Sequence, residues 1–275
     1  MRKIEVCCGN LRDAIEAQEG GAERIELCSA LEVGGLTPSY GLVKAVQEMC
    51  PRLPVNVIIR PRGGDFVYDG EEVAQMLLDI IQCRLMRVHG VVIGALTPAG
   101  DIDLPVCRLL VKAARGVTEN LHSTISPLIS NLCSLPSNLC SLHSTLYTLS
   151  SIPSLSVTFH RAFDVCRDPR QALEDIVSLG CDRLLTSGQR ATALQGAENI
   201  ASYVRQAAGR IIIMPGCGVN PDNIAEIEHI TAAGEFHSTA RGASFTNQVH
   251  TNPHVDFDEN QPQRRTSRSV IEQLL

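Results

Sequence analysis

The chain has 275 residues, of which 44% are hydrophobic and 20% are charged, and its formal net charge at pH 7 is −6. This composition excludes a fully disordered chain, because it provides enough apolar side chains for a core. No apolar run reaches about 18 residues, so we expect no membrane span. The acidic balance and the lack of a basic stripe argue against a nucleic-acid partner.

Eleven cysteines are many for this length. Disulfide frameworks belong to short secreted chains with an even number of cysteines, and this chain is long and its number is odd. Residues 1–10 contain no apolar stretch typical of a signal peptide. We therefore expect a cytoplasmic protein whose thiols are mostly free and buried.

Short runs rich in β-branched residues recur along the chain and predict eight strands. The runs 55–59 and 211–214 are almost continuously apolar, which is typical of parallel strands buried on both faces. The predicted strands are Lys3–Cys7, Arg24–Cys28, Pro54–Arg60, Gly90–Ala95, Ser156–Arg161, Arg183–Ser187, Arg210–Met214 and Glu235–Ser238.

Amphipathic patterns between these strands predict helices. Asn10, Asp168 and Asn220 are predicted to cap three of them, the last two followed by proline at the first helical position. The apolar stripes with helical spacing are Val73, Met76, Leu77, Ile80 and Ile81, then Ala172, Leu173, Ile176 and Val177, then Ile224, Ile227 and Ile230.

Eight strand-then-helix units predict a TIM-type (β/α)8 barrel in a single domain. An open, doubly wound sheet that binds a dinucleotide is disfavoured, because no Gly-x-Gly-x-x-Gly turn follows the first strand. The barrel is expected to span residues 1–242.

A low-complexity insertion at about 117–155 is expected to interrupt the barrel before strand five. It is rich in Ser and Leu, and Ser-Asn-Leu-Cys-Ser-Leu occurs in it twice, at 130–135 and 137–142. A short interaction module is the alternative interpretation. Residues 243–275 are expected to form an irregular C-terminal segment, either a lid or a loose connection, that ends in a short helix at Val270–Leu275.

Functional groups in barrel enzymes lie at the carboxyl ends of the strands. Glu5 and Cys7 share one face of the first strand, and Glu26 and Cys28 share one face of the second. If both pairs point inward, two thiols and two carboxylates converge, and two close thiolates suit Cu(I). The alternative is that both cysteines are ordinary core residues.

The end of strand three carries two arginines, Arg60 and Arg62, followed by Asp65. We expect the arginines either to clamp an anion or to pair with Glu5 and Glu26. A structural network of ion pairs inside the barrel is the alternative.

The remaining strand ends carry a second group of candidates. His160, Arg161 and Asp164 follow strand five and suit acid–base chemistry. Glycine-containing loops after strands seven and eight often bind phosphate in barrels, although glycines also simply permit tight turns. The candidates on strands six to eight are Ser187, Gly216, Gly218, His237 and Ser238.

Six strings occur in order along the chain. They are Glu-Val-Cys-Cys at 5–8, Gly-Ala-Glu-Arg-Ile-Glu-Leu-Cys at 21–28, Gly-Gly-Leu-Thr-Pro-Ser at 34–39, Ile-Arg-Pro-Arg-Gly-Gly-Asp-Phe at 59–66, Thr-Phe-His-Arg-Ala-Phe-Asp at 158–164 and Leu-Thr-Ser-Gly-Gln at 185–189. Together they resemble the copper homeostasis protein CutC family. The resemblance covers residues 1–116 and 156–242, and it implies a TIM-type barrel, cytoplasmic residence and a link to copper. Cys7 and Cys28 match the two cysteines discussed as Cu(I) ligands in that family.

Two functions follow as hypotheses. In the first, the chain binds copper(I) through Cys7 and Cys28 without catalysis. In the second, it is an enzyme of unknown reaction that acts on a small phosphorylated or carboxylated metabolite. The short final helix leaves part of the barrel wall thin, which makes a homodimer a candidate assembly. For the enzyme, the catalytic candidates are Glu26, Arg60, His160 and Asp164, and the ligand-binding candidates are Glu5, Arg62, Asp65, Arg161, Ser187, Gly216, Gly218, His237 and Ser238.

Overall fold

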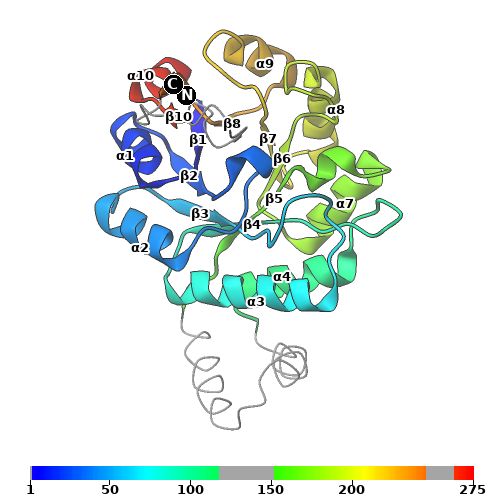
Figure 1. The fold of residues 1–275 in the computed structure, drawn as a ribbon. Coiled ribbons are helices and arrows are strands. Elements are labelled where there is room, and N and C mark those ends of the chain that lie inside the picture. Colours follow the sequence, from blue (N-terminus) through cyan, green and yellow to red (C-terminus); the bar gives the residue numbers. More distant parts are fainter. Residues whose placement is uncertain (1, 118–151, 246–262) are drawn as a thin grey trace, which may run out of the picture.

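The computed structural model describes residues 2–117, 152–245 and 263–275. Within them, eight parallel strands form one sheet in the order β7-β6-β5-β4-β3-β2-β1-β8. The two strands at the ends of this order, β7 and β8, lie side by side, so the sheet curls into a nearly closed barrel. Figure 1 shows the strands at the centre and the helices around them. The predicted (β/α)8 barrel is confirmed.

Each of the eight predicted strands is present, with ends that differ from the prediction by at most two residues. Boundary differences of this size are normal, because strand ends lose their ladder hydrogen bonds gradually. The observed strands are β1 (Lys3–Cys8), β2 (Arg24–Leu27), β3 (Val55–Ile58), β4 (Gly90–Ile93), β5 (Ser156–Phe159), β6 (Arg183–Thr186), β7 (Ile212–Pro215) and β8 (Glu235–Ser238).

One α-helix follows each barrel strand among the described residues. The 3-10 helices η1 (Leu31–Val33) and η2 (Arg161–Val165) lie in the loops after β2 and β5. No helix in the described ranges is both long and apolar enough to cross a membrane. The α-helices are α1 (Leu11–Glu19), α2 (Tyr40–Met49), α3 (Gly70–Leu85), α4 (Leu104–Arg115), α7 (Pro169–Leu179), α8 (Ala197–Ala207), α9 (Ile224–Thr231) and α10 (Arg268–Leu274).

Two of the three predicted helix caps are confirmed. The side chain of Asn10 accepts a hydrogen bond from the Asp13 amide, and that of Asp168 accepts from the first amides of α7. The prediction for Asn220 is wrong. Its side chain accepts from the Asp222 amide in a turn, and α9 begins only at Ile224.

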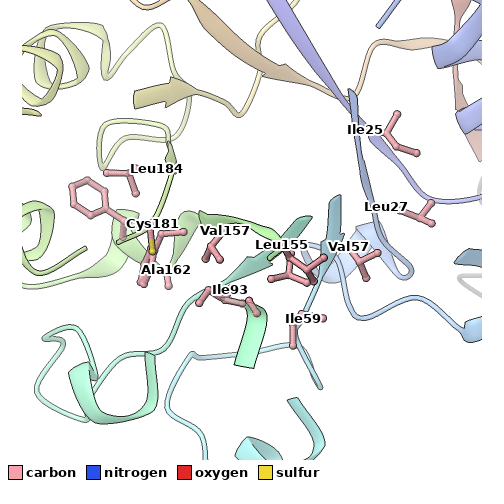
Figure 2. Packing of buried hydrophobic residues seen from close by; sticks show 14 of the residues in the cluster. Ile25, Leu27, Val57, Ile59, Ile93, Leu155, Val157, Ala162, Cys181 and Leu184 are labelled. Atoms are coloured by element: carbon pink, nitrogen blue, oxygen red, sulfur yellow. The ribbon is translucent and has the colours of Figure 1, made fainter. Parts of the chain in front are cut away.

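The core lies between the outer face of the barrel and the helices. Side chains alternate along each strand, so Ile25 and Leu27 of β2 pack outward, as does Val57 of β3. Figure 2 shows these residues in line with Ile93 and Val157 of the next strands. The inward positions between them are consequently left to a different set of residues, many of them polar.

The C-terminal segment is more ordered at its ends than predicted. β9 (Arg241–Phe245) pairs antiparallel with β10 (Gln263–Thr266). The amide of Thr266 donates to Asp13 on α1 at 3.0 Å, and Ile271 of α10 packs fully buried beside Gly20. The expected irregular tail is therefore corrected at both ends, while residues 246–262 lie outside the described residues. The predicted insertion also lies outside them, apart from residue 117 and residues 152–155.

Candidate functional site

The carboxyl ends of the strands surround a cavity of about 450 Å³. Its wall is formed by residues of β1, β2, β3, β6, β8 and β9 and of the loops after β2, β3, β5, β7 and β8. The sequence-predicted residues that line it are Cys7, Glu26, Arg60, His160, Arg161, Asp164, Gly218, His237 and Ser238.

A cluster of metal-ligating groups lies on the β8–β1–β2 side of this cavity. Ligand atoms of Cys7, Glu26 and His237 all lie within 4.8 Å of one another. The Sγ atoms of Cys7 and Cys28 are 3.8 Å apart, and all four residues are buried. We call these four residues the thiol cluster. The register of the strands explains why these residues meet. Cys7 lies opposite Glu26 across β1 and β2, and Glu5 lies opposite His237 across β1 and β8.

The thiol cluster contains an activated thiol. The hydrogen bond from Cys28 lowers the pKa of Cys7 to about 5, with a further contribution from His237. The same interaction with Cys7, together with burial, raises the pKa of Cys28 well above its usual value. Burial raises the pKa of Glu26 to about 8, and the Cys7 thiolate adds to this effect. One thiolate is thus present at neutral pH, which is the form that binds metals.

A layer of charged residues supports the thiol cluster from inside the barrel. Arg24 donates to Glu5 at 2.5 Å and to Glu235 at 2.7 Å, and Glu235 also accepts from Arg183 at 2.8 Å. Glu5 is fully buried and contacts His237 Nδ1 at 3.0 Å. We call Glu5, Arg24, Arg183 and Glu235 the charged layer. Barrel interiors are usually filled by branched apolar side chains, so this layer departs from the common pattern.

Electrostatics within this layer are strongly coupled. Burial raises the pKa of Glu5, but the hydrogen bonds and charges of His237 and Arg24 outweigh it and bring the pKa to about 2. Burial lowers the pKa of His237, whereas its contacts with Cys7 and Glu5 raise it well above the usual value. These contacts favour the protonated form of the imidazole.

The two arginines after β3 do not pair with Glu5 or Glu26, which corrects that expectation. Arg60 donates to the backbone carbonyls of Val33, Gly35 and Gly64. Arg62 points away from the thiol cluster and forms ion pairs with Asp65 and with Glu72 of α3. Arg24, which lies two residues before Glu26 on β2, pairs with Glu5 in their place.

Asp164 is the centre of a hydrogen-bond network at the ends of β5 and β6. Its carboxylate accepts from the hydroxyl of Thr186 at 2.5 Å, from the amide and hydroxyl of Ser187, and from Arg161 at 2.8 Å. The predicted neighbours Arg161, Asp164 and Ser187 are therefore brought together. Their hydrogen bonds join the η2 loop to the end of β6, which is a positioning role.

Glycine and serine candidates on β7 and β8 have structural partners. A side chain at Gly216 would approach Leu185 to 2.4 Å, and Gly218 adopts a φ of +77°. The hydroxyl of Ser238 donates to the Val219 carbonyl at 2.6 Å. α9 begins six residues after Gly218, and the side chain of its N-cap residue, Asn223, donates to the Gly218 carbonyl at 2.8 Å.

Sequence reasoning missed several residues of this site. It did not select Arg24, Arg183 and Glu235, although charged residues inside predicted buried strands were an available signal. It placed His237 among ligand-binding residues, and only the β1–β8 register reveals its position beside Cys7.

The fold and site define a (β/α)8 barrel with a buried thiol, carboxylate and imidazole cluster at its mouth. The CutC family model matches residues 2–143 and 141–242, and the chain belongs to the CutC family.

Named relatives agree with this membership. A CutC family protein of Parabacteroides distasonis is 45% identical over 254 residues, which cover 92% of this chain and 89% of the relative. A second, from Bacteroides thetaiotaomicron, is 41% identical and covers 98% and 95%. A solved structure from Streptococcus agalactiae, provisionally assigned as the copper homeostasis protein CutC, is 30% identical with a TM-score of 0.70, covering 87% of this chain and 99% of that one.

Proposed function

We propose that the chain binds copper(I) in the cytoplasm through Cys7 and Cys28. The observation that carries this proposal is the 3.8 Å separation of the two buried Sγ atoms beside His237 and Glu26. Soft thiolates select Cu(I), and one of the two thiols already favours its thiolate form. The provisional copper homeostasis assignment of the Streptococcus agalactiae protein supports the same metal.

His237 is suited to be a third ligand. Its Nδ1 faces the Glu5 carboxylate at 3.0 Å, and its Nε2 lies 3.5 Å from Glu26 on the cavity side. Metal-binding histidines commonly donate their other ring N–H to a carboxylate, which fixes the ring and its tautomer. On binding, the ion replaces the proton at Nε2.

Competition with a chromogenic Cu(I) chelator in the presence of glutathione tests the proposal. The intact chain is expected to bind one Cu(I) per protein more tightly than glutathione does, and Cys7→Ser/Cys28→Ser is expected to lose this binding. The matched control is Cys83→Ser/Cys107→Ser, which removes two buried thiols outside the cavity. Equal affinity of the intact chain and the Cys7/Cys28 variant would refute the proposal.

The alternative function, an enzyme acting on a small anionic metabolite, is favoured by one observation. The cavity of about 450 Å³ is far larger than a single ion requires, since a water molecule occupies about 30 Å³. Turnover of sugar phosphates or dicarboxylates by the purified chain, followed by NMR, tests this function. Unchanged spectra with every candidate metabolite would count against it.

A further inference from the structure

A buried cation without a counter-ion among the described residues lies at the end of β3 in the wall of the cavity. The Arg60 side chain is 5% exposed, and its guanidinium is held by the Val33, Gly35 and Gly64 carbonyls and stacked over the Phe66 ring at 4.9 Å. Among the described residues no carboxylate forms an ion pair with Arg60, whose guanidinium hydrogen bonds go to backbone carbonyls, and its Nε has no hydrogen-bond partner. Carbonyl dipoles do not neutralise a buried charge, so an anion at this position is favoured.

A buried hydrogen-bond donor without a partner lies at the same wall. Nδ1 of His160 accepts from the Ala162 amide at 3.2 Å, which requires the proton of the neutral ring to sit on Nε2. That Nε2 is buried and has no partner among the described residues. An unsatisfied buried N–H is costly, and an oxygen of a ligand in the cavity would remove the cost.

The backbone of β4 makes room for this donor. A side chain at Gly94 would lie 2.4 Å from Cε1 of His160, so the ring occupies space that only glycine leaves free. Phe66 separates the ring from Arg60, with its centroid 5.0 Å from that of His160. The two polar groups are therefore held in fixed positions on one wall.

Two further arginines line the cavity, one after β5 and one after β8. Arg161 is neutralised by Asp164 at 2.8 Å. Arg241 is exposed at the rim next to β8, and its charge also acts on Asp13 of α1. Within the part of the chain that the structure describes, Arg60 thus remains the buried cation of this cavity without an ion-pair partner, and the cavity is large enough for a small molecule.

We propose that the wall formed by Arg60 and His160 binds the carboxylate or phosphate group of a small organic anion, with Arg241 attracting it at the rim. This site does not depend on copper binding, because it shares no residue with the thiol cluster. It identifies the chemical class of ligand for the cavity and the groups that hold it.

The test is a calorimetric titration of the full-length chain with inorganic phosphate and with malonate at constant ionic strength. At least one anion is expected to bind. Arg60→Met is expected to weaken the affinity for this anion by about tenfold or more, and Arg241→Met by about two- to fivefold. Lys44→Met removes a positive charge from the exposed side of α2 and is expected to leave the affinity unchanged. Preference for one anion distinguishes phosphate from carboxylate ligands.

NMR of the histidine rings keeps the proposal testable even if Arg60→Met does not fold. The Nε2–H signal of His160 is expected in the free protein and to shift on addition of the bound anion. Cys7→Ser/Cys28→Ser is expected to retain anion binding, which separates this proposal from copper binding. The proposal is overturned if neither anion binds up to ~50 mM, if folded Arg60→Met keeps the affinity of the intact chain, or if binding occurs without a shift of the His160 signal.

Discussion

Glu5→Gln is expected to destabilise the protein by about 3 kcal/mol at pH 7. The carboxylate is fully buried. It accepts hydrogen bonds from Arg24 at 2.5 Å and from Asn56 at 3.0 Å, and it contacts Nδ1 of His237 at 3.0 Å. Its pKa falls from 4.5 to about 2, and at 1.36 kcal/mol per pKa unit this corresponds to about 3 kcal/mol. The usual cost of about 3–5 kcal/mol for removing one partner of a buried ion pair agrees with that value.

The pH dependence has a defined sign. Because the folded-state pKa of Glu5 is lowered, its contribution is fully present above pH 4.5 and is lost as the pH falls through about 2. The stability difference between the intact chain and Glu5→Gln should therefore be constant between about pH 4.5 and pH 6.5, where His237 is not yet titrating, and shrink below pH 4.5.

Urea unfolding followed by circular dichroism at 222 nm measures the effect, since the chain has no tryptophan. Glu174→Gln is the matched control. The pKa of Glu174 is also lowered to about 2, by hydrogen bonds from Arg210 and Gln206, but its side chain is 42% exposed. Solvent screens that pair, so the control is expected to be nearly neutral. A loss below about 1 kcal/mol for Glu5→Gln would refute the reasoning, because that is the range of exposed pairs.

Two further predictions concern the opposite wall. Gly94→Ala places a methyl group 2.4 Å from the His160 ring. We therefore expect this substitution to lower the melting temperature and, because it displaces the ring, to weaken phosphate or malonate binding. A melting curve identical to that of the intact chain would contradict this prediction. Burial, assisted by the charge of Arg60, lowers the pKa of His160 to about 3, so its stabilising contribution is present above pH 6.5 and declines as the pH falls toward 3. When the pH falls from 6.5 to 5, the free energy of unfolding of the intact chain should decrease by about 2 kcal/mol more than that of His160→Asn. Asparagine is chosen because its side chain can still cap η2. Equal decreases in urea titrations at the two pH values would show that His160 is not the titrating group.

The thiol cluster combines closely spaced groups of metal-ligating type with a structural cost. Cys7, Glu26 and His237 are buried together, and the charged layer beneath them holds ionised groups inside a barrel. Buried ion pairs contribute little net stability compared with apolar packing. Their presence at one side of the barrel mouth is therefore better explained by the positions they impose on His237 and Cys7 than by stability.

The strand pattern and the repeated strand-then-helix order were sufficient to predict the barrel. In these strands and helices, the residues of each element determine its structure independently of the rest of the chain. The alternation that turns Ile25 and Leu27 outward also turns Glu26 inward, and Asn10 and Asp168 cap their helices through contacts within three residues. The convergence of Cys7 and Cys28 followed from the same alternation on two neighbouring strands.

Only the tertiary structure decided which charges meet. Arg24, rather than Arg60 or Arg62, pairs with Glu5, because the β1–β2 register places Arg24 directly opposite that residue. His237 joins the thiol cluster through the β1–β8 pairing, which connects residues 232 positions apart. Such contacts depend on the register at which the barrel closes. No local pattern encodes that register, so the ion pairs, the shifted pKa values and the unpartnered groups of Arg60 and His160 emerge only when the fold is complete.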